Sequence, residues 1–202
     1  MTRFSIGVDL AAKVDWTAIA VLRDGDEVPH LARWRPRSWS EVIQRLLDLE
    51  ARPSLRGAAV RIGVDVGGPH AAEVLSIFRA APLRSEVFAL IATSSPKPPK
   101  QLDDGRILVS KRLLVAGLVS ALPRLRLAQH LELAGVLANE LRDYRQTEGP
   151  DGRPRWSNAT PRAHDDLVSA LQLAVWTDSL TGQGIAGRLA PLERKEPCAH
   201  SF

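Results

Sequence analysis

Four aspartates are the residues of this sequence best suited to chemistry. They lie in three widely separated motifs: Gly7-Val8-Asp9, Gly63-Val64-Asp65 and His164-Asp165-Asp166. The first two motifs each end an apolar run, and the third opens an apolar helical stretch. Carboxylates at strand ends and at a helix start can converge on one point, and an all-oxygen cluster of this kind suits Mg²⁺ or Mn²⁺. The pattern therefore indicates phosphodiester cleavage.

Two such ions would supply the chemistry of hydrolysis. Divalent ions held about 4 Å apart activate a water molecule and stabilise the leaving 3′ oxygen of a phosphodiester. We expect Asp9 to bridge both ions, with Asp65 and Asp166 each completing the coordination of one. Asp165 or Asp15 is the candidate outer ligand.

Each aspartate also has an ordinary structural explanation. Asp9 alone is typical of a residue that starts a turn after a strand, and aspartates near a helix start are stabilised by capping and by the helix dipole. Their shared setting favours the metal site, because a carboxylate among apolar neighbours is costly unless it is paired or bound to a metal. Two acidic strand ends also indicate the functional edge of a sheet.

Three further residues are candidates for contacts with a substrate. His164 could orient water or bind a phosphate, although helix capping or simple exposure is the more common role of a single histidine. Lys111 and Arg112 begin a helix after a proline-rich loop and could contact a nucleic-acid backbone. A solvated cationic surface is the competing interpretation for this pair.

The elements that must position these residues follow from the hydrophobic pattern. Strands are predicted over 4–10, 17–23, 27–35, 58–65 and 86–92, the first three as an antiparallel meander. Helices are predicted over 40–50, 70–81, 110–120, 131–145 and 164–180, the first with a capping box of Ser38 and Glu41. Loops are predicted over 93–105 and 146–161, with a short extended piece at 125–127.

This order predicts an α/β fold with one mixed five-stranded sheet, in which three antiparallel strands precede parallel ones, flanked by helices. It is the element order of the ribonuclease H-like fold. A length of 202 residues fits one domain, which we place at residues 1–182. Residues 183–202 are predicted to form a disordered tail.

Composition narrows the class of protein. Hydrophobic residues make up 45% of the chain and charged residues 25%, as in an ordinary globular protein, and the net charge of +4 is compatible with a nucleic-acid partner without requiring one. The single cysteine, Cys198, excludes a disulfide within the chain and a cysteine-based zinc site. Asp9 interrupts the first apolar run before a signal peptide can form, and no apolar window could span a membrane, which predicts a cytoplasmic protein.

The motifs resemble those of the nuclease domain of phage terminase large subunits, over about residues 4–180. The matching segments are Gly7-Val8-Asp9-Leu10-Ala11 with Asp15-Trp16-Thr17, Val64-Asp65-Val66-Gly67-Gly68-Pro69, Val109-Ser110-Lys111-Arg112, Glu140-Leu141-Arg142-Asp143-Tyr144 and His164-Asp165-Asp166-Leu167-Val168-Ser169-Ala170-Leu171. The last of these is the most specific.

This resemblance implies a Mg²⁺- or Mn²⁺-dependent endonuclease that cuts double-stranded viral DNA during genome packaging. It implies that Asp9, Asp65 and the pair Asp165 and Asp166 are metal ligands, with Asp166 preferred within the pair. Terminases carry an ATPase motor before the nuclease, and the sequence has no Gly-x-x-x-x-Gly-Lys-[Ser/Thr] phosphate loop. A separate packaging ATPase or portal component is therefore the expected partner, in the bacterial host of a phage or prophage. Met1 favours a short gene over an excised domain.

Other functions remain open on the same residues. A junction resolvase or RNA–DNA hybrid nuclease would share the fold and the metal ligands. A non-catalytic DNA-binding or assembly protein could have kept the scaffold alone. An actin-like kinase is disfavoured, because such proteins need two domains around the nucleotide and 202 residues are too few.

Overall fold

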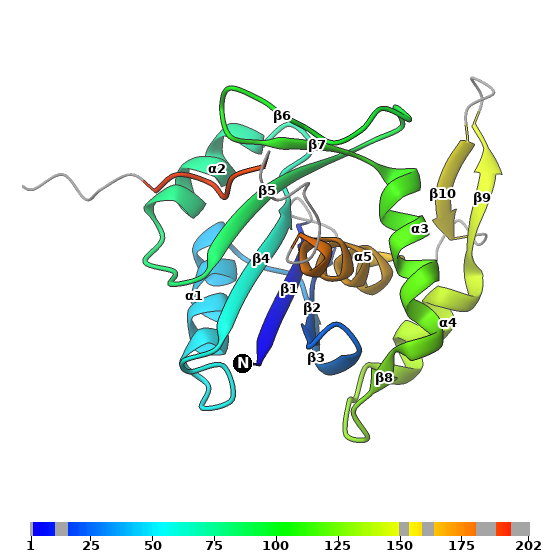
Figure 1. Ribbon diagram of the computed structural model, residues 1–202, viewed down its shortest axis with the longest axis horizontal. Coiled ribbons are helices and arrows are strands. Elements are labelled where there is room, and N and C mark those ends of the chain that lie inside the picture. Colours follow the sequence, from blue (N-terminus) through cyan, green and yellow to red (C-terminus); the bar gives the residue numbers. More distant parts are fainter. Residues whose placement is uncertain (1, 11–15, 150–153, 159–163, 181–188, 195–202) are drawn as a thin grey trace, which may run out of the picture.

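The structure, a computed structural model, describes residues 2–10, 16–149, 154–158, 164–180 and 189–194 (Figure 1). Its main strands are β1 (Arg3–Asp9), β2 (Thr17–Arg23), β3 (Glu27–Trp34), β4 (Ala59–Asp65), β5 (Glu86–Thr93), β6 (Lys100–Gln101), β7 (Ile107–Ser110) and β8 (Arg126–Leu127). They form one mixed sheet in the order β6-β7-β5-β4-β1-β2-β3-β8. β1, β2 and β3 pair antiparallel, whereas β4 pairs parallel with both β1 and β5.

Helices cover both faces of this sheet (Figure 1). They are α1 (Trp39–Ala51), α2 (Ala71–Ala80), α3 (Lys111–Ala121), α4 (Ala134–Asp143) and α5 (Asp166–Ser179), with a short 3₁₀ turn at Leu122–Arg124. A second sheet consists of the hairpin β9 (Tyr144–Glu148) and β10 (Pro154–Asn158). Within the described residues, no helix is long and apolar enough to cross a membrane.

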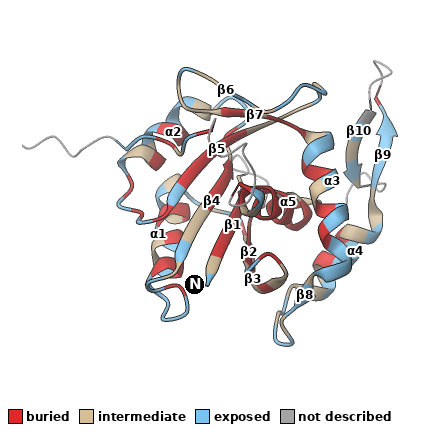
Figure 2. Ribbon diagram, viewed as in Figure 1, coloured by how far each residue is buried: buried red, intermediate tan, exposed pale blue. Residues whose placement is uncertain are grey.

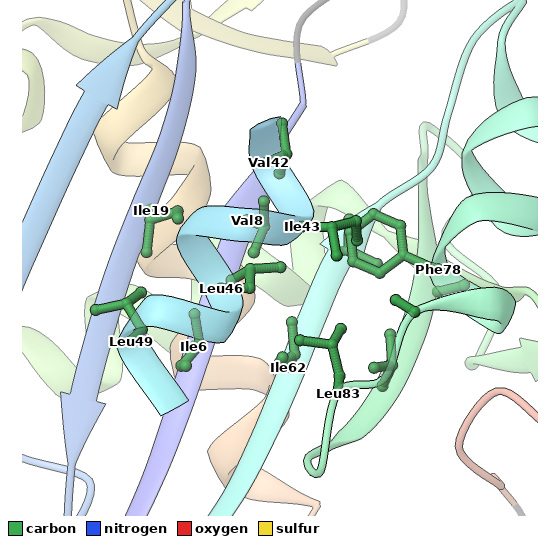
Figure 3. Packing of buried hydrophobic residues seen from close by; sticks show 14 of the residues in the cluster. Ile6, Val8, Ile19, Val42, Ile43, Leu46, Leu49, Ile62, Phe78 and Leu83 are labelled. Carbon is green, nitrogen blue, oxygen red and sulfur yellow. The ribbon is translucent and has the colours of Figure 1, made fainter. Parts of the chain in front are cut away.

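The alternation of side chains along β1 decides which residues meet which helices. Ile6 and Val8 are fully buried and pack under α1, where Leu46 fills the space above them (Figure 3). The residues between them point to the opposite face, because successive side chains of a strand alternate. That opposite face is covered by α5, so Gly7 and Asp9 lie on the α5 side.

α5 is the most deeply buried helix, and Figure 2 shows it red along most of its length. It packs between the sheet and α3, and a helix buried all round needs apolar residues on every side rather than one stripe. Leu171 and Ala174 contact the β2 side of the sheet, while Leu173 and Trp176 contact the β5 side. The helix is thus fixed over the middle of the sheet.

The predicted fold class is confirmed, because the five predicted strands form the centre of a mixed sheet between helices. The sheet has eight strands rather than five, since β6, β7 and β8 extend its edges. The prediction of a loop over 146–161 was wrong for 146–148 and 154–158, which belong to the β9–β10 hairpin, and residues 144–145 of that hairpin were predicted as the end of a helix. Residues 145–148 are all exposed, so this strand lacks the apolar alternation by which a strand is detected.

The capping of α1 and the end of the chain also differ from expectation. The Ser38 hydroxyl accepts from Glu41 N as predicted, but the Glu41 carboxylate accepts from Arg37 N instead of Ser38 N. In the stretch predicted to be a disordered tail, residues 189–194 lie against the sheet. Leu192 N donates to Val87 O at 2.6 Å, and the Leu192 side chain is buried in the core.

Candidate functional site

The first two acidic motifs come together because their strands are neighbours in register. Ile6-Gly7-Val8 of β1 pairs in parallel with Ile62-Gly63-Val64 of β4, residue for residue. Asp9 and Asp65 follow these triplets by one position each, so they leave the sheet side by side. Paired residues of parallel strands point to the same face, which here is the face covered by α5.

Two glycines allow α5 to approach this face closely. A Cβ added at Gly7 would lie 1.8 Å from Ala170 O, and one at Gly63 would lie 2.1 Å from Thr177 Oγ1. The backbone of α5 therefore rests directly on β1 at Gly7, and the Thr177 hydroxyl of α5 rests on β4 at Gly63. Gly7 lies two residues before Asp9 in β1, which is a distance of roughly 6.6 Å along the strand. Ala170 lies four residues after Asp166 in α5, which is a distance of about 6 Å along the helix axis. The start of α5 therefore lies over the two strand ends.

The third acidic motif forms the start of α5. Asp165 is the N-cap residue and Asp166 is the first residue of the helix, with 7% of its surface exposed. The Asp165 side chain makes no capping hydrogen bond. Capping falls instead to Glu140 of α4, whose Oε2 accepts from Leu167 N at 3.0 Å and from Val168 N at 3.2 Å.

The carboxylates interact electrostatically. Burial raises the pKa of Asp9 well above its usual value, and the charges of Asp65, Asp166 and Asp165 raise it further. Burial also raises the pKa of Asp65, while a hydrogen bond from Gly67 N to Asp65 Oδ1, 2.8 Å long, opposes that shift. A like-charged group of this kind is unfavourable by itself and becomes favourable when a cation neutralises it.

Lys111 is the cation that faces this group. Its charge lowers the pKa of both Asp9 and Asp65, so it lies near the carboxylates at the start of α3. Its Nζ also lies 5.9 Å from the centre of the Tyr144 ring. Arg112, the next residue, is exposed and lines an adjoining cleft.

The structure brings most of the sequence-predicted residues to one edge of the sheet. His164 is exposed, with Nδ1 3.8 Å from Asp166 Oδ2. Asp15 lies outside the described residues. Among the residues that the structure describes, no three carboxylate, imidazole or thiol groups are arranged to hold an ion as they stand. The four aspartates therefore share one region without surrounding a common point.

Glu140 is the residue of this region that sequence reasoning missed as a functional candidate. Besides capping α5, it accepts from Arg33 Nη1 at 2.9 Å, and the guanidinium of Arg33 lies 5.1 Å from the centre of the Trp16 ring. Burial raises the pKa of Glu140 to about 7, although the backbone donors and Arg33 favour its charged form. A charged residue at an apolar helix position was the available signal, but its partner lies 27 and 28 residues further along the chain.

No protein-family model and no curated protein matches the sequence, whereas several solved structures match the fold. The large terminase nuclease from thermophilic phage G20c aligns over 86% of this chain and 81% of its own, with a TM-score of 0.63 and 23% identity. The same nuclease with bound magnesium aligns over 87% and 81%, with a TM-score of 0.62 and 21% identity. This chain has the fold of a large terminase nuclease domain.

A second phage gives the same result. The large terminase nuclease domain of Thermus phage P74-26 aligns over 86% of this chain and 78% of its own, with a TM-score of 0.55 and 22% identity. At this level of identity the likeness shows the fold alone.

Proposed function

We propose that this chain is a Mg²⁺- or Mn²⁺-dependent endonuclease that hydrolyses DNA by a two-ion mechanism, as the nuclease of a viral packaging terminase. The observation that carries the proposal is the paired register of β1 and β4 under the start of α5. It brings the charges of Asp65 and Asp166 close enough to raise the pKa of Asp9. The structure of the G20c terminase nuclease with bound magnesium, which has a similar fold, supports the choice of metal.

The donor set fits divalent ions of this kind, because it consists of carboxylate oxygens alone. Asp9 would bridge two ions, with Asp65 and Asp166 each holding one and Asp165 as an outer ligand. The ions would activate the attacking water and stabilise the leaving 3′ oxygen.

The other residues of the site hold this arrangement in place. Gly67 N donates to Asp65 Oδ1 and so restrains that carboxylate. Glu140 holds the first turn of α5, and therefore the backbone that carries Asp166. Lys111 supplies a positive charge beside the carboxylates, where it can bind a non-bridging phosphate oxygen of the scissile group. His164, beside Asp166, is the candidate for orienting water or binding phosphate.

The biological setting follows from the same proposal. We place the protein in the cytoplasm of a bacterial host, encoded by a phage or prophage, with double-stranded DNA as substrate. A packaging ATPase or portal component is the partner that this function implies.

Plasmid nicking tests the activity. Wild-type protein with Mn²⁺ or Mg²⁺ should convert supercoiled plasmid to nicked and linear forms, and EDTA should stop the reaction. Asp9→Asn, Asp65→Asn and Asp166→Asn should each lower the rate at least about 100-fold. Asp103→Asn is the matched control, because Asp103 is an exposed carboxylate between β6 and β7, remote from the site. Cleavage that survives in Asp9→Asn with added metal would refute the assignment.

A panel of DNA substrates separates the related functions. Comparable cutting of linear duplex and four-way junctions supports the terminase assignment, whereas strong preference for junctions would favour a resolvase. DNA binding without metal-dependent cutting, unchanged in Asp65→Asn, would point to a non-catalytic scaffold. Asp165→Asn beside Asp166→Asn compares the two candidates at the start of α5, and the greater loss should fall on the buried Asp166.

A further inference from the structure

A cleft of about 540 Å³ opens next to the proposed catalytic carboxylates. It lies where β5 ends and α3 begins, under β10 of the hairpin, and Figure 1 shows α3 between the sheet and that hairpin. Its volume falls in the range of sites that enclose a small organic ligand. The residues that line it include Ser94, Ser95, Ser110, Lys111, Arg112 and Trp156.

The lining combines an aromatic ring, hydroxyls and cations. The indole of Trp156 packs against Tyr144, with ring centroids 6.4 Å apart and an interplanar angle of 21°. Lys111 Nζ lies 5.9 Å from the Tyr144 ring, and the same lysine charge acts on Asp9 and Asp65. Trp156 is therefore linked through Tyr144 and Lys111 to the carboxylates.

We propose that this cleft binds one nucleotide of an unpaired DNA strand, with the base stacked on Trp156 and its phosphate on Arg112 and the Ser94 and Ser95 hydroxyls. This inference rests on the proposed nuclease function, because it assigns the cleft to the strand that runs away from the scissile phosphate. The strand would be unpaired at one nucleotide or more beside the cut.

The chemistry of the lining favours an unpaired strand over a duplex. Inside a duplex both faces of each base are covered by neighbouring bases, so an indole reaches a base face only where stacking is broken. Stacking of single-stranded bases on aromatic side chains tolerates any base, which fits a cleft whose described lining residues include no Asn, Gln, Asp or Glu side chain to read base edges. Arg112 is exposed, and a guanidinium binds a phosphate through paired hydrogen bonds.

Binding in EDTA tests the cleft without cleavage. The probes are a fluorescein-labelled thymidine decamer and a labelled blunt duplex, measured by fluorescence anisotropy. Trp156→Ala should weaken binding of the decamer about 5- to 100-fold and change binding of the duplex far less. Trp156→Phe keeps an aromatic face and should restore most of the affinity. Arg112→Ala should weaken both probes and lower the salt dependence of binding.

Trp39→Ala is the matched control, because Trp39 is a partly exposed tryptophan that lines a different cleft beside His70. It should bind both probes as the wild type does, and circular dichroism should show each variant folded. The inference is wrong if Trp156→Ala binds the decamer normally, or if it loses decamer and duplex binding equally. If binding of the decamer depends on Trp156 but the protein never cuts DNA, only the proposed nuclease function is overturned. If cleavage requires Asp9 but binding of the decamer does not depend on Trp156, only the proposal for the cleft is overturned.

Discussion

The close contact between α5 and the sheet makes Gly7→Ala the sharpest test of how this fold builds its site. The added methyl would lie 1.8 Å from Ala170 O and 2.5 Å from Ala174 N, both of them backbone atoms of α5. Non-bonded atoms need about 3.5 Å, so the helix must retreat by roughly 1.5 Å or the strand must bend. No rotation of a side chain can relieve the clash.

The size of the effect follows from what moves. Overpacking of a well-packed core costs about 1–3 kcal/mol, and the rigid obstacle here puts Gly7→Ala at about 3 kcal/mol. A domain of ordinary stability, about 5–15 kcal/mol, would remain folded. Asp166 sits on the displaced helix, and a shift of about 1 Å can lower a catalytic rate about 100-fold. Stability and cleavage should therefore both fall.

Urea denaturation in EDTA measures the loss of stability, and plasmid nicking with Mn²⁺ measures the loss of cleavage. Gly135→Ala in α4 is the control, because no atom lies within 4 Å of the added methyl. Alanine is also the better helix former, by about 1 kcal/mol. The Gly135→Ala variant should match or exceed wild-type stability and cut DNA normally. If Gly7→Ala is as stable as Gly135→Ala, the packing of α5 on β1 is not as described.

The remaining predictions concern charge. Asp9→Asn should raise the thermal midpoint in EDTA, since burial and then repulsion by Asp65, Asp166 and Asp165 disfavour the charged form, and Mg²⁺ should stabilise the wild type more than this variant. A loss of stability in metal-free Asp9→Asn would refute the repulsion. The raised pKa of Glu140 means that the folded state binds its proton more tightly than the unfolded state, so stability should fall as the pH rises from 4.5 to about 7. Glu140→Gln should remove about 3 kcal/mol of that dependence, which urea titrations across this range would measure, and an unchanged dependence would contradict the shift.

The strand ends of the site were predictable because the sequence repeats a tetrapeptide. Residues 6–9 and 62–65 both read Ile-Gly-Val-Asp, and in the structure the first three positions of each pair with each other. The apolar residues predicted the strands, and the aspartates predicted their shared edge. The register itself could not be predicted, because it depends on how α5 and α1 fill the two faces.

Two parts of the site lay beyond sequence reasoning for different reasons. The β9–β10 hairpin carries Trp156, yet residues 145–148 of β9 are polar and all exposed, so no apolar alternation marks that strand. Glu140 belongs to a helix that was predicted, but its capping role depends on α4 lying beside the start of α5. Contacts between elements far apart in the chain leave no local signal.

The capping by Glu140 argues against hydrogen-bonded capping as the role of the pair Asp165 and Asp166. If these aspartates served only to cap α5, Asp165 would accept hydrogen bonds from the first turn, and it accepts none there. The amides of Leu167 and Val168 are bound by Glu140 instead. An additional carboxylate then brings no capping benefit, and its charge disfavours the ionised form of Asp9. The helix dipole still favours a negative charge at this position, and a bound cation would offset the repulsion that Asp9 meets there.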